Sequence, residues 1–355
     1  MNRYYTRACN FYYGEISKKK IKLKQSLPLN NRQDISFDHV EIISRENVKK
    51  ISISKIHKLP KSIKIKVKKD ILKITRKVKN FLNLDLNNKT HLMGVLNITP
   101  DSFSDGGKYT SEQKAYNQML KLFEDGASIV DIGGESTKPG SKPISENTEW
   151  NRIHKVLKKI KKIKKIKKNN LVSIDTRKSS IMKKSLSLGV KIVNDVSGLN
   201  YDKDTINVLK QTNAPFVLQH SLDDPETMQI NPKYKNVLLD IYDFFEQKIN
   251  HLRKSGITHD KIILDPGIGF GKNLNHNLKI LKNISLYHTL GFPILLGISR
   301  KRFIREISKN NDSDYRLGGT LGSGIFAFKQ GIQILRVHDV NEIKQGLIVY
   351  QELIK

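Results

Sequence analysis

Polar side chains close a series of short apolar runs between residues 91 and 340 of this 355-residue chain. Asp175, Asn194 and Asp265 each end such a run, and their carboxylate and amide groups suit the N–H edge of a flat heterocycle. The last two runs bring groups that suit an anion: Lys301, Arg336 and His338. A single Asp or Asn after a strand is explained equally well as a turn or helix-capping residue. Because almost every run ends in this way, the set predicts a ligand site, provided that the runs end at one rim.

The runs themselves predict the scaffold. Each is about five residues long and rich in Val, Ile and Leu: MGVLN, SIVDI, LVSID, KIVND, PFVLQ, KIILD, PILLG and QILRV. Runs without polar alternation are typical of strands buried on both faces of a parallel sheet. The segments between them, such as SEQKAYNQMLKLFEDGA, have helical spacing. Eight strand–helix units predict an α/β fold, a (β/α)8 TIM barrel over residues 89–355, with its chemistry at the C-terminal ends of the strands.

Residues 1–88 differ from the rest and form a small basic N-terminal extension. SFDHVEIISR predicts a short strand, IKIKV alternates like a strand, and ILKITRKVKNFL has helical spacing. We expect an extension that packs on the barrel, and a separate interaction module is the alternative.

The net charge of +30, from 64 Lys and Arg against 34 Asp and Glu, raises the question of a nucleic-acid or membrane partner. The excess is mostly Lys accompanied by Ile and Asn, the bias of an AT-rich genome, and no aromatic residues are interleaved for base stacking. We therefore expect no nucleic-acid partner; binding through the basic N-terminal region, in addition to catalysis, is the alternative.

Other features predict a cytoplasmic protein without a membrane partner. No run of roughly 18 apolar residues could span a membrane, and the N-terminus lacks the order of a signal peptide. Cys9 is the only cysteine, which excludes an intrachain disulfide and a thiolate metal site.

Short motifs narrow the chemistry. DPGIGFGKN (265–273) has the glycines of a weak dinucleotide-binding pattern, but Asp-Pro-Gly is a turn, and the glycines would let the backbone approach a ligand beside Phe270. There is no Walker loop, no Gly-x-Ser-x-Gly and no His and carboxylate cluster with metal-ligand spacing. Asn97, which ends the first run, offers one oxygen to Mg²⁺, whose other ligands are typically waters and phosphate oxygens.

Several segments resemble one family. MGVLNITPDSFSDGG, DIGGESTKPGS, SIDTRKS, VNDVSG, ILDPGIGFGKNLNHN, LLGISRKRF, RLGGTLGSG and RVHDV stand in the order seen in dihydropteroate synthases, over residues 91 to about 350. The extension resembles the N-terminal segment of alphaproteobacterial members. The resemblance implies condensation of 4-aminobenzoate with 6-hydroxymethyl-7,8-dihydropterin diphosphate, giving 7,8-dihydropteroate and pyrophosphate in folate biosynthesis. It also implies a homodimer.

The resemblance further implies a role for each matching residue. The pterin would be held by Asp175, Asn194, Asp265 and Lys301. The pyrophosphate, with Mg²⁺ as cofactor, would be held by Asn97, Arg336 and His338. The second loop would contact substrate through Thr137 and Lys138. The 4-aminobenzoate pocket, where sulfonamides compete, would be lined by Phe103, Pro139, Phe270 and Ser299. The catalytic set would be Lys301, Arg336, His338 and Asp101.

The implied mechanism is dissociative. Pyrophosphate leaves first, and the aniline nitrogen then attacks a carbocation at the exocyclic methylene. Because a neutral aniline is already nucleophilic, catalysis would come from stabilising the departing charge, positioning the reactants and excluding water. TPDSFSDGG would be a mobile loop with hinges at Gly106 and Gly107, and it would bring Asp101 and Phe103 over the substrates.

The chain departs from the family pattern at three places, of which GGKYTSEQ, in place of a more usual Gly-Gly-x-Phe loop exit, is a small change. Lys138 stands where the family usually has Arg, and it lacks the bidentate fork for phosphate, so we expect a weaker pyrophosphate contact. Gln219 and Ser221 replace parts of a Met-His-Met type sequence, which makes that wall of the pocket more polar.

Two other functions are alternatives to this interpretation. A methyltetrahydrofolate methyltransferase would share the barrel and the pterin contacts, but would not be expected to carry TPDSFSDGG, ESTKPGS or SRK. A non-catalytic binding protein on this barrel should have lost the loop and anion-site residues that remain here: Asn97, Asp101, Lys301, Arg336 and His338.

Overall fold

The structure is a computed structural model that describes residues 3–79, 82, 84–99, 111–138, 140–160, 170–222, 226–309, 312 and 314–355. Eight parallel strands form one sheet, and each coincides with most of one apolar run: β5 (His91–Asn97), β6 (Ile129–Gly133), β7 (Leu171–Asp175), β8 (Ile192–Asp195), β9 (Phe216–Gln219), β10 (Ile262–Asp265), β11 (Leu295–Gly297) and β12 (Ile334–Val337). The order is β10-β9-β8-β7-β6-β5-β12-β11, and a parallel bridge from Leu264 to Ile294 joins its two ends. The predicted TIM barrel is therefore confirmed.

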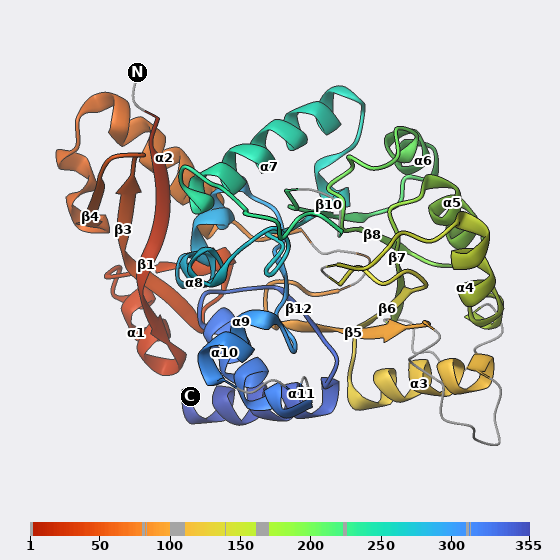
Figure 1. Cartoon of the computed structure of the whole chain (residues 1–355). Coiled ribbons are helices and arrows are strands. Elements are labelled where there is room, and N and C mark those ends of the chain that lie inside the picture. Colours follow the sequence, from red (N-terminus) through yellow and green to blue (C-terminus); the bar gives the residue numbers. More distant parts are fainter. Residues whose placement is uncertain are drawn as a thin grey trace.

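Helices surround the strands on the outside (Figure 1). They are α3 (Ser111–Asp125), α4 (Glu146–Ile160), α5 (Ser179–Ser187), α6 (Thr205–Thr212), α7 (Val237–Lys254), α8 (Leu274–Lys282), α9 (Arg302–Ser308), α10 (Leu317–Lys329) and α11 (Val340–Leu353). The short 3-10 helices η4 (His259–Lys261), η5 (Ile284–Leu290) and η6 (Asp314–Arg316) complete this part. No helix within the described residues is both long and apolar enough to cross a membrane.

Near the N-terminal ends of the strands, the inside of the barrel is filled by one apolar side chain from each strand. We call this layer the apolar floor. These eight side chains form a single buried cluster with Leu84 and Leu86: Met93, Ile129, Leu171, Ile192, Val217, Ile263, Leu295 and Ile334. Because side chains alternate between the two faces of a strand, the next inward position is two residues further along each strand. The residues two positions beyond the floor residues, towards the C-terminal ends of the strands, therefore form the next inward layer.

The N-terminal extension has a fold of its own and lies beside the barrel (Figure 1, red and orange). Its elements are β1 (Tyr5–Tyr13), α1 (Gly14–Lys22), β2 (Leu27–Pro28), η1 (Leu29–Asn31), β3 (Ile35–Ile43), β4 (Val48–Ser52), η2 (Ile53–Lys58) and α2 (Lys61–Thr75). The four strands make an antiparallel sheet in which β3 pairs with each of the others. The strand predicted from SFDHVEIISR is confirmed as β3.

The strand-like interpretation of IKIKV is wrong, because these residues lie in α2. Val67 and Ile74 are buried on one face of that helix, and Ile63 and Ile71 pack against the same core. This is the spacing of a helix, and the alternation within five residues was too short to distinguish the two periods.

The extension packs tightly on the barrel. Ser285 Oγ in η5 donates to Ala8 O at 2.9 Å, and the ring of Tyr5 lies edge-on to Tyr242 of α7 at 5.1 Å. Tyr13 Oη donates to Lys329 O at the end of α10. The contacts therefore link the extension to three separate parts of the barrel.

Candidate active site

The layer above the apolar floor is polar. Two residues beyond the floor position of their strands lie Asp131, Asn194, Asp265 and Arg336, and all four are buried or mostly buried. Gly297 takes the same position on β11, where an added Cβ would meet nothing within 4 Å. Strand geometry thus gathers ionic and amide groups inside the barrel at the C-terminal end of the strands.

Arg336 is the centre of this layer. Its Nε donates to Asp131 Oδ2 at 2.7 Å and its Nη2 donates to Asp175 Oδ2 at 2.8 Å. Asn194 Nδ2 donates to the same Asp131 oxygen at 2.9 Å. Four residues from four strands are therefore tied into one network, and the third guanidinium nitrogen, Nη1, takes no part in it.

The network leaves three acceptors unpaired. Asp131 Oδ1, Asp175 Oδ1 and Asn194 Oδ1 are buried and make no hydrogen bond within the described chain. Buried polar atoms without partners are rare, because each costs roughly 1–3 kcal/mol. Three of them on neighbouring strands, β6, β7 and β8, fit a ligand with several N–H donors along one edge.

Asp265 and Lys301 form the opposite side of the site. Gly267 N donates to Asp265 Oδ1 at 2.7 Å, and Lys301 Nζ lies 4.3 Å from the centre of the Phe270 ring. Burial raises the pKa of Asp265 to about 6 and lowers the pKa of Lys301 to about 8, while the attraction between the two charges opposes both shifts. Both groups are therefore mainly charged at pH 7.

Asp175 is the carboxylate that is hardest to ionise. Burial raises its pKa above the usual range, against the opposing charge of Arg336, and the neighbouring Asp131 raises it further. The ion pair with Arg336 opposes this shift and favours the ionised form of Asp175.

His338 enters the site as a neutral ring. Burial, followed by the charges of Arg336 and Arg300, lowers its pKa to about 3. Its Nδ1 lies 3.0 Å from Ser299 Oγ, which also accepts from His338 N at 3.2 Å. The structure therefore brings Ser299 and His338 together, and any contact between His338 and an anion would be a neutral hydrogen bond.

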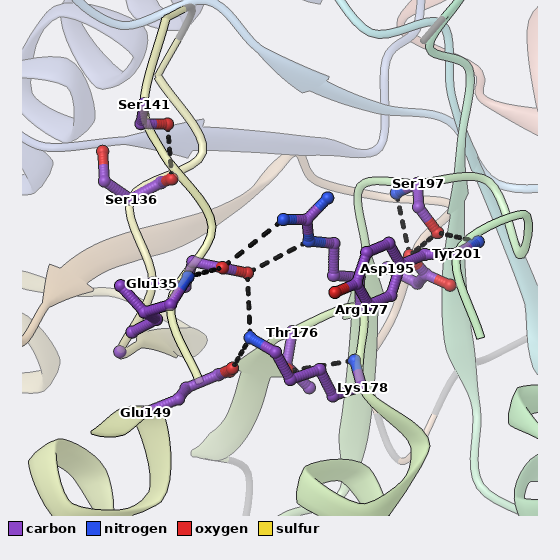
Figure 2. Close-up of polar contacts among 12 residues, drawn as sticks. Glu135, Ser136, Ser141, Glu149, Thr176, Arg177, Lys178, Asp195, Ser197 and Tyr201 are labelled. Atoms are coloured by element: carbon purple, nitrogen blue, oxygen red, sulfur yellow. Dashed lines mark hydrogen bonds and ion pairs between the residues drawn. The ribbon is translucent and has the colours of Figure 1, made fainter. Parts of the chain in front are cut away.

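A second buried network anchors the loop after β6 (Figure 2). Glu135 accepts from Arg177 Nε at 3.1 Å, and Lys178 Nζ lies 3.2 Å from Glu135 and 2.6 Å from Glu149. Ile144 N also donates to Glu135 at 2.9 Å. Although burial alone would raise it, the pKa of Glu135 is held below its usual range by these donors and cations. Two acids and two bases thus fix the base of the loop.

That loop carries two of the predicted substrate contacts. Thr137 is half-buried and Lys138 is exposed. The Ser141 hydroxyl lies 2.6 Å from both Ser136 O and Lys138 O and donates to these carbonyl oxygens, which holds the turn between them. Three other predicted site residues lie outside the described residues: Asp101, Phe103 and Pro139. The predicted mobile loop from Pro100 to Gly107 lies outside them as well.

One wall of the candidate site contains Phe270, Gln219 and Ser221. Phe270 is packed with Val196 and Met228, so it presents little free surface. Gln219 Nε2 approaches Val196 O at 3.5 Å, and Ser221 Oγ contacts the Met228 sulfur at 3.7 Å. The two polar departures from the family pattern are therefore turned partly towards the protein itself.

The sequence interpretation missed three buried groups. Asp131 was hidden inside the run SIVDI, yet a charged residue within a strand buried on both faces needs an ionic partner, and this was the available signal. The pairing of Glu135 with Arg177 and Lys178 had no such signal. Lys272 had no such signal either. Its Nζ donates to Phe270 O at 2.8 Å and lies 3.0 Å from His220 Nδ1, and burial lowers its pKa to about 7.

The donors at the mouth are compatible with Mg²⁺ bound chiefly through a substrate. Within the described residues no three His, Cys, Asp or Glu side chains are grouped to hold a metal ion. Asn97 Oδ1 and the Asp175 side chain both adjoin Gly133, within 3.6 Å of where its Cβ would stand. Mg²⁺ commonly takes one or two protein oxygens, with waters and phosphate oxygens as its other ligands, so Asn97 fits this pattern.

Comparison with known proteins identifies the family. Residues 93–338 match the pterin binding enzyme family. Dihydropteroate synthase of Escherichia coli K12 is 37% identical over 269 residues, which are 76% of this chain and 93% of that protein.

Solved structures agree with the sequence relatives. Dihydropteroate synthase of Xanthomonas albilineans with 4-aminobenzoic acid superposes with a TM-score of 0.70 at 32% identity, covering 76% of this chain and 94% of that one. The same enzyme in complex with 7,8-dihydropteroate gives a TM-score of 0.67 at 30% identity, over 76% and 95% of the two chains. Sequence, fold and the polar layer inside the barrel lead to one conclusion: this chain belongs to the dihydropteroate synthase family of pterin-binding enzymes.

Proposed function

We propose that this protein condenses 6-hydroxymethyl-7,8-dihydropterin diphosphate with 4-aminobenzoate to give 7,8-dihydropteroate and pyrophosphate. The observation that carries the proposal is the set of three unpaired buried acceptors, Asp131 Oδ1, Asp175 Oδ1 and Asn194 Oδ1. Arg336 holds Asp131 and Asp175 directly, and Asn194 donates to Asp131. The Xanthomonas albilineans relative was solved with 4-aminobenzoic acid and with 7,8-dihydropteroate, which supports the same pair of ligands for this chain.

The pterin ring would lie between the two sides of the site. Its N–H groups would donate to the unpaired oxygens of the three acceptors and to Asp265, and Lys301 would donate to its ring acceptors. A ligand that supplies several N–H donors at once removes the cost of several buried unpaired oxygens. An analogue without those donors should therefore bind far more weakly.

The reaction would proceed by departure of pyrophosphate before attack. The bond from the exocyclic methylene to the diphosphate oxygen breaks and its electron pair leaves with the pyrophosphate. The nitrogen lone pair of 4-aminobenzoate then forms the new C–N bond, and the nitrogen loses one proton. The buried carboxylates Asp131 and Asp265 favour a cationic pterin, which supports this order of steps.

The diphosphate would be bound by groups that take no part in the carboxylate network. Arg336 Nη1, His338 and Lys138 of the loop after β6 are available for the diphosphate, and Ser299 orients His338. Mg²⁺, held in part by Asn97, would neutralise charge on the departing pyrophosphate. We propose Phe270 and Ser299 as walls of the 4-aminobenzoate pocket, where a sulfonamide would compete.

We further propose a homodimer through α10 and α11. The two helices expose neighbouring apolar side chains, with Phe326 46%, Ile348 48% and Val349 53% accessible. Light scattering at the mass of a single chain would contradict this proposal.

The decisive experiment measures pyrophosphate release by the purified protein with both substrates and Mg²⁺. We expect release that depends on 4-aminobenzoate and that a sulfonamide inhibits in competition with it. A protein that binds the pterin but releases no pyrophosphate would be a binding protein and would overturn the proposal.

Lys301→Ala tests the site at the level of one residue. Loss of the buried cation should reduce turnover by roughly 100-fold or more, as for other preorganised electrostatic groups. The fold should survive, because Lys301 is held in a setting that disfavours its charge. Arg302→Ala is the matched control, since the Arg302 side chain is 63% exposed and its ion pair, as far as the structure describes the chain, is with Glu306. Near-normal turnover in Lys301→Ala would refute the assignment of Lys301.

A further inference from the structure

A cavity of about 520 Å³ lies where the extension meets the barrel. Its wall on the extension side is the C-terminal end of α2 and the residues after it, and its wall on the barrel side is the end of α7, with η4 and the loop before β11. We call this space the junction cavity.

The junction cavity is remote from the candidate active site. His259, which lines it, begins η4 immediately before β10, and Gly291 precedes β11. These are the N-terminal ends of strands whose C-terminal ends carry Asp265 and lead to Lys301. In a parallel barrel the two ends of the strands are opposite faces, so the cavity is a second place where a ligand can be bound.

Its lining is strongly basic. Six cationic side chains surround it: Lys69, Lys73, Arg76, Lys77, Lys79 and Arg253. Among the described lining residues the one carboxylate, Glu246, already accepts from Arg3 Nη2 at 2.6 Å. Six cations against one carboxylate leave this lining with a net positive charge.

The cations of the extension side are unpaired. Within the part of the chain that the structure describes, Lys69, Lys73, Arg76, Lys77 and Lys79 form no ion pair, although Lys66 on the same helix does, with Asp70. Burial lowers the pKa of Lys73, the charges of Asp70 and Glu246 oppose this shift, and those of Lys66 and Lys69 add to it. Like charges gathered at one concave surface repel one another, and an anionic ligand would relieve that repulsion.

We propose that the junction cavity binds a small polyphosphate, either free or attached to a small organic molecule. A volume of about 520 Å³ is in the range of small-molecule sites, roughly 300–1,000 Å³. Six cations in one cavity require more than one phosphate group for charge balance. The exposed His259 ring, stacked on the buried Phe292 at 3.9 Å, gives the barrel side of the cavity a flat ring surface that suits an attached ring.

Binding would connect two parts of the molecule. Lys73 and Arg76 belong to the extension and Arg253 belongs to the barrel, so one ligand would contact both. A ligand that binds only the folded state stabilises it in proportion to the logarithm of its concentration over its dissociation constant. The proposal thus predicts a melting temperature that rises with polyphosphate concentration.

The test uses calorimetric titration of the full chain with inorganic tripolyphosphate and, separately, with ATP. Lys73→Gln/Arg76→Gln should weaken binding of both at least tenfold. The control Lys61→Gln/Lys68→Gln removes the same charge from exposed positions of the same helix outside the cavity, and should change affinity less than twofold. Equal affinities for the two probes would assign the site to the phosphates alone, and tighter binding of ATP would assign part of it to the attached ring.

Three outcomes would overturn the proposal. One is the absence of saturable binding, and another is equal weakening in the two double variants, which would indicate only delocalised charge. The third is tighter binding of a single-stranded oligonucleotide with the same sensitivity to Lys73 and Arg76, which would make the cavity part of a nucleic-acid surface. Pyrophosphate release is measured in parallel and should be unchanged in both double variants. Failure of that assay in the wild type would refute the proposed function and leave the junction cavity unaffected.

Discussion

Asp131 holds the candidate site together, because it accepts from Arg336 and from Asn194 while its second oxygen stays unpaired. A buried ion pair of this kind adds little net stability, but removal of one partner typically costs about 3–5 kcal/mol. The arrangement is therefore better explained by binding than by stability. It presents preoriented acceptors to a ligand in a setting from which water is excluded.

Asp131→Asn tests this role. The amide keeps the shape of the side chain but removes the charge that holds Arg336, so we expect pterin affinity to fall at least tenfold and thermal stability to fall as well. Affinity is measured by calorimetry with a pterin, and folding is checked by the melting curve. Unchanged pterin affinity in a folded Asp131→Asn protein would contradict the role given to Asp131.

Asp265 predicts a pH dependence with opposite signs for binding and stability. Its pKa is raised from 3.8 to about 6 in the folded protein, so its carboxylate takes up a proton as the pH falls through 6. Affinity for the pterin should then decrease below pH 6, since an acceptor is lost. Between pH 6 and 4 the folded state binds more protons than the unfolded state, so this group makes the fold more stable as the pH falls.

The comparison that isolates Asp265 is wild type against Asp265→Asn. Both kcat/KM for the pterin substrate and the free energy of unfolding are followed between pH 4 and pH 7.5. The variant should lack the part of each pH profile that belongs to Asp265. Identical profiles in the two proteins would show that another group titrates.

At the scale of the elements, the sequence was sufficient to predict the eight barrel strands and several of the residues at their ends. Uninterrupted runs of Val, Ile and Leu have few alternatives once eight of them alternate with helical segments. Asp131 could not be recognised in the same way, because it lies inside the run SIVDI, one residue before its last residue, and not at its end. Ion pairs such as that of Glu135 with Arg177 join loops that are distant in sequence, and no local pattern encodes them. The strand-like reading of IKIKV failed because five residues do not distinguish a strand from one face of a helix.

The loop after β6 provides the prediction at this scale. Glu135 anchors the loop through Arg177, Lys178 and Ile144 N, and it acts as a positioning residue for Thr137 and Lys138. Glu135→Gln should raise KM for the diphosphate substrate more than it lowers kcat, because the loop is displaced while the pterin acceptors stay in place. Glu146→Gln is the control, since Glu146 forms an exposed ion pair with Lys184 at 2.9 Å. If Glu135→Gln lowers the thermal stability but leaves KM unchanged, the network has a structural role only.

At the scale of the whole molecule, the extension and the barrel share one interface. Leu29 of the extension is fully buried, and its Cδ2 atom lies 2.5 Å from where a Cβ of Gly331 would stand. Gly331 has a φ of +75°, so both its backbone and its lack of a side chain suit this contact. Such close packing indicates that the two parts unfold together.

Leu29→Ala tests this cooperativity. Truncation of a buried leucine typically costs about 2–5 kcal/mol. Trp150, the single tryptophan, lies in α4 on the barrel, so its fluorescence reports the barrel alone. The midpoint of the Trp150 transition should shift as far as that of far-UV circular dichroism. The control Leu23→Ala changes a leucine that is 54% exposed and should shift neither. A Trp150 transition that does not move in Leu29→Ala would show that the extension unfolds separately.

The contacts of the extension also set an order of events during synthesis. Ala8 meets Ser285, which is 277 residues later in the chain, and Tyr13 meets Lys329, which is 316 residues later. At roughly 5–20 residues per second, the ribosome needs about 15–60 s to deliver these partners. For that time Ala8 and Tyr13 lack the barrel residues that they contact, and neighbouring nascent chains can associate through this segment. The lysines of this segment oppose such association, because like charges on neighbouring chains repel one another.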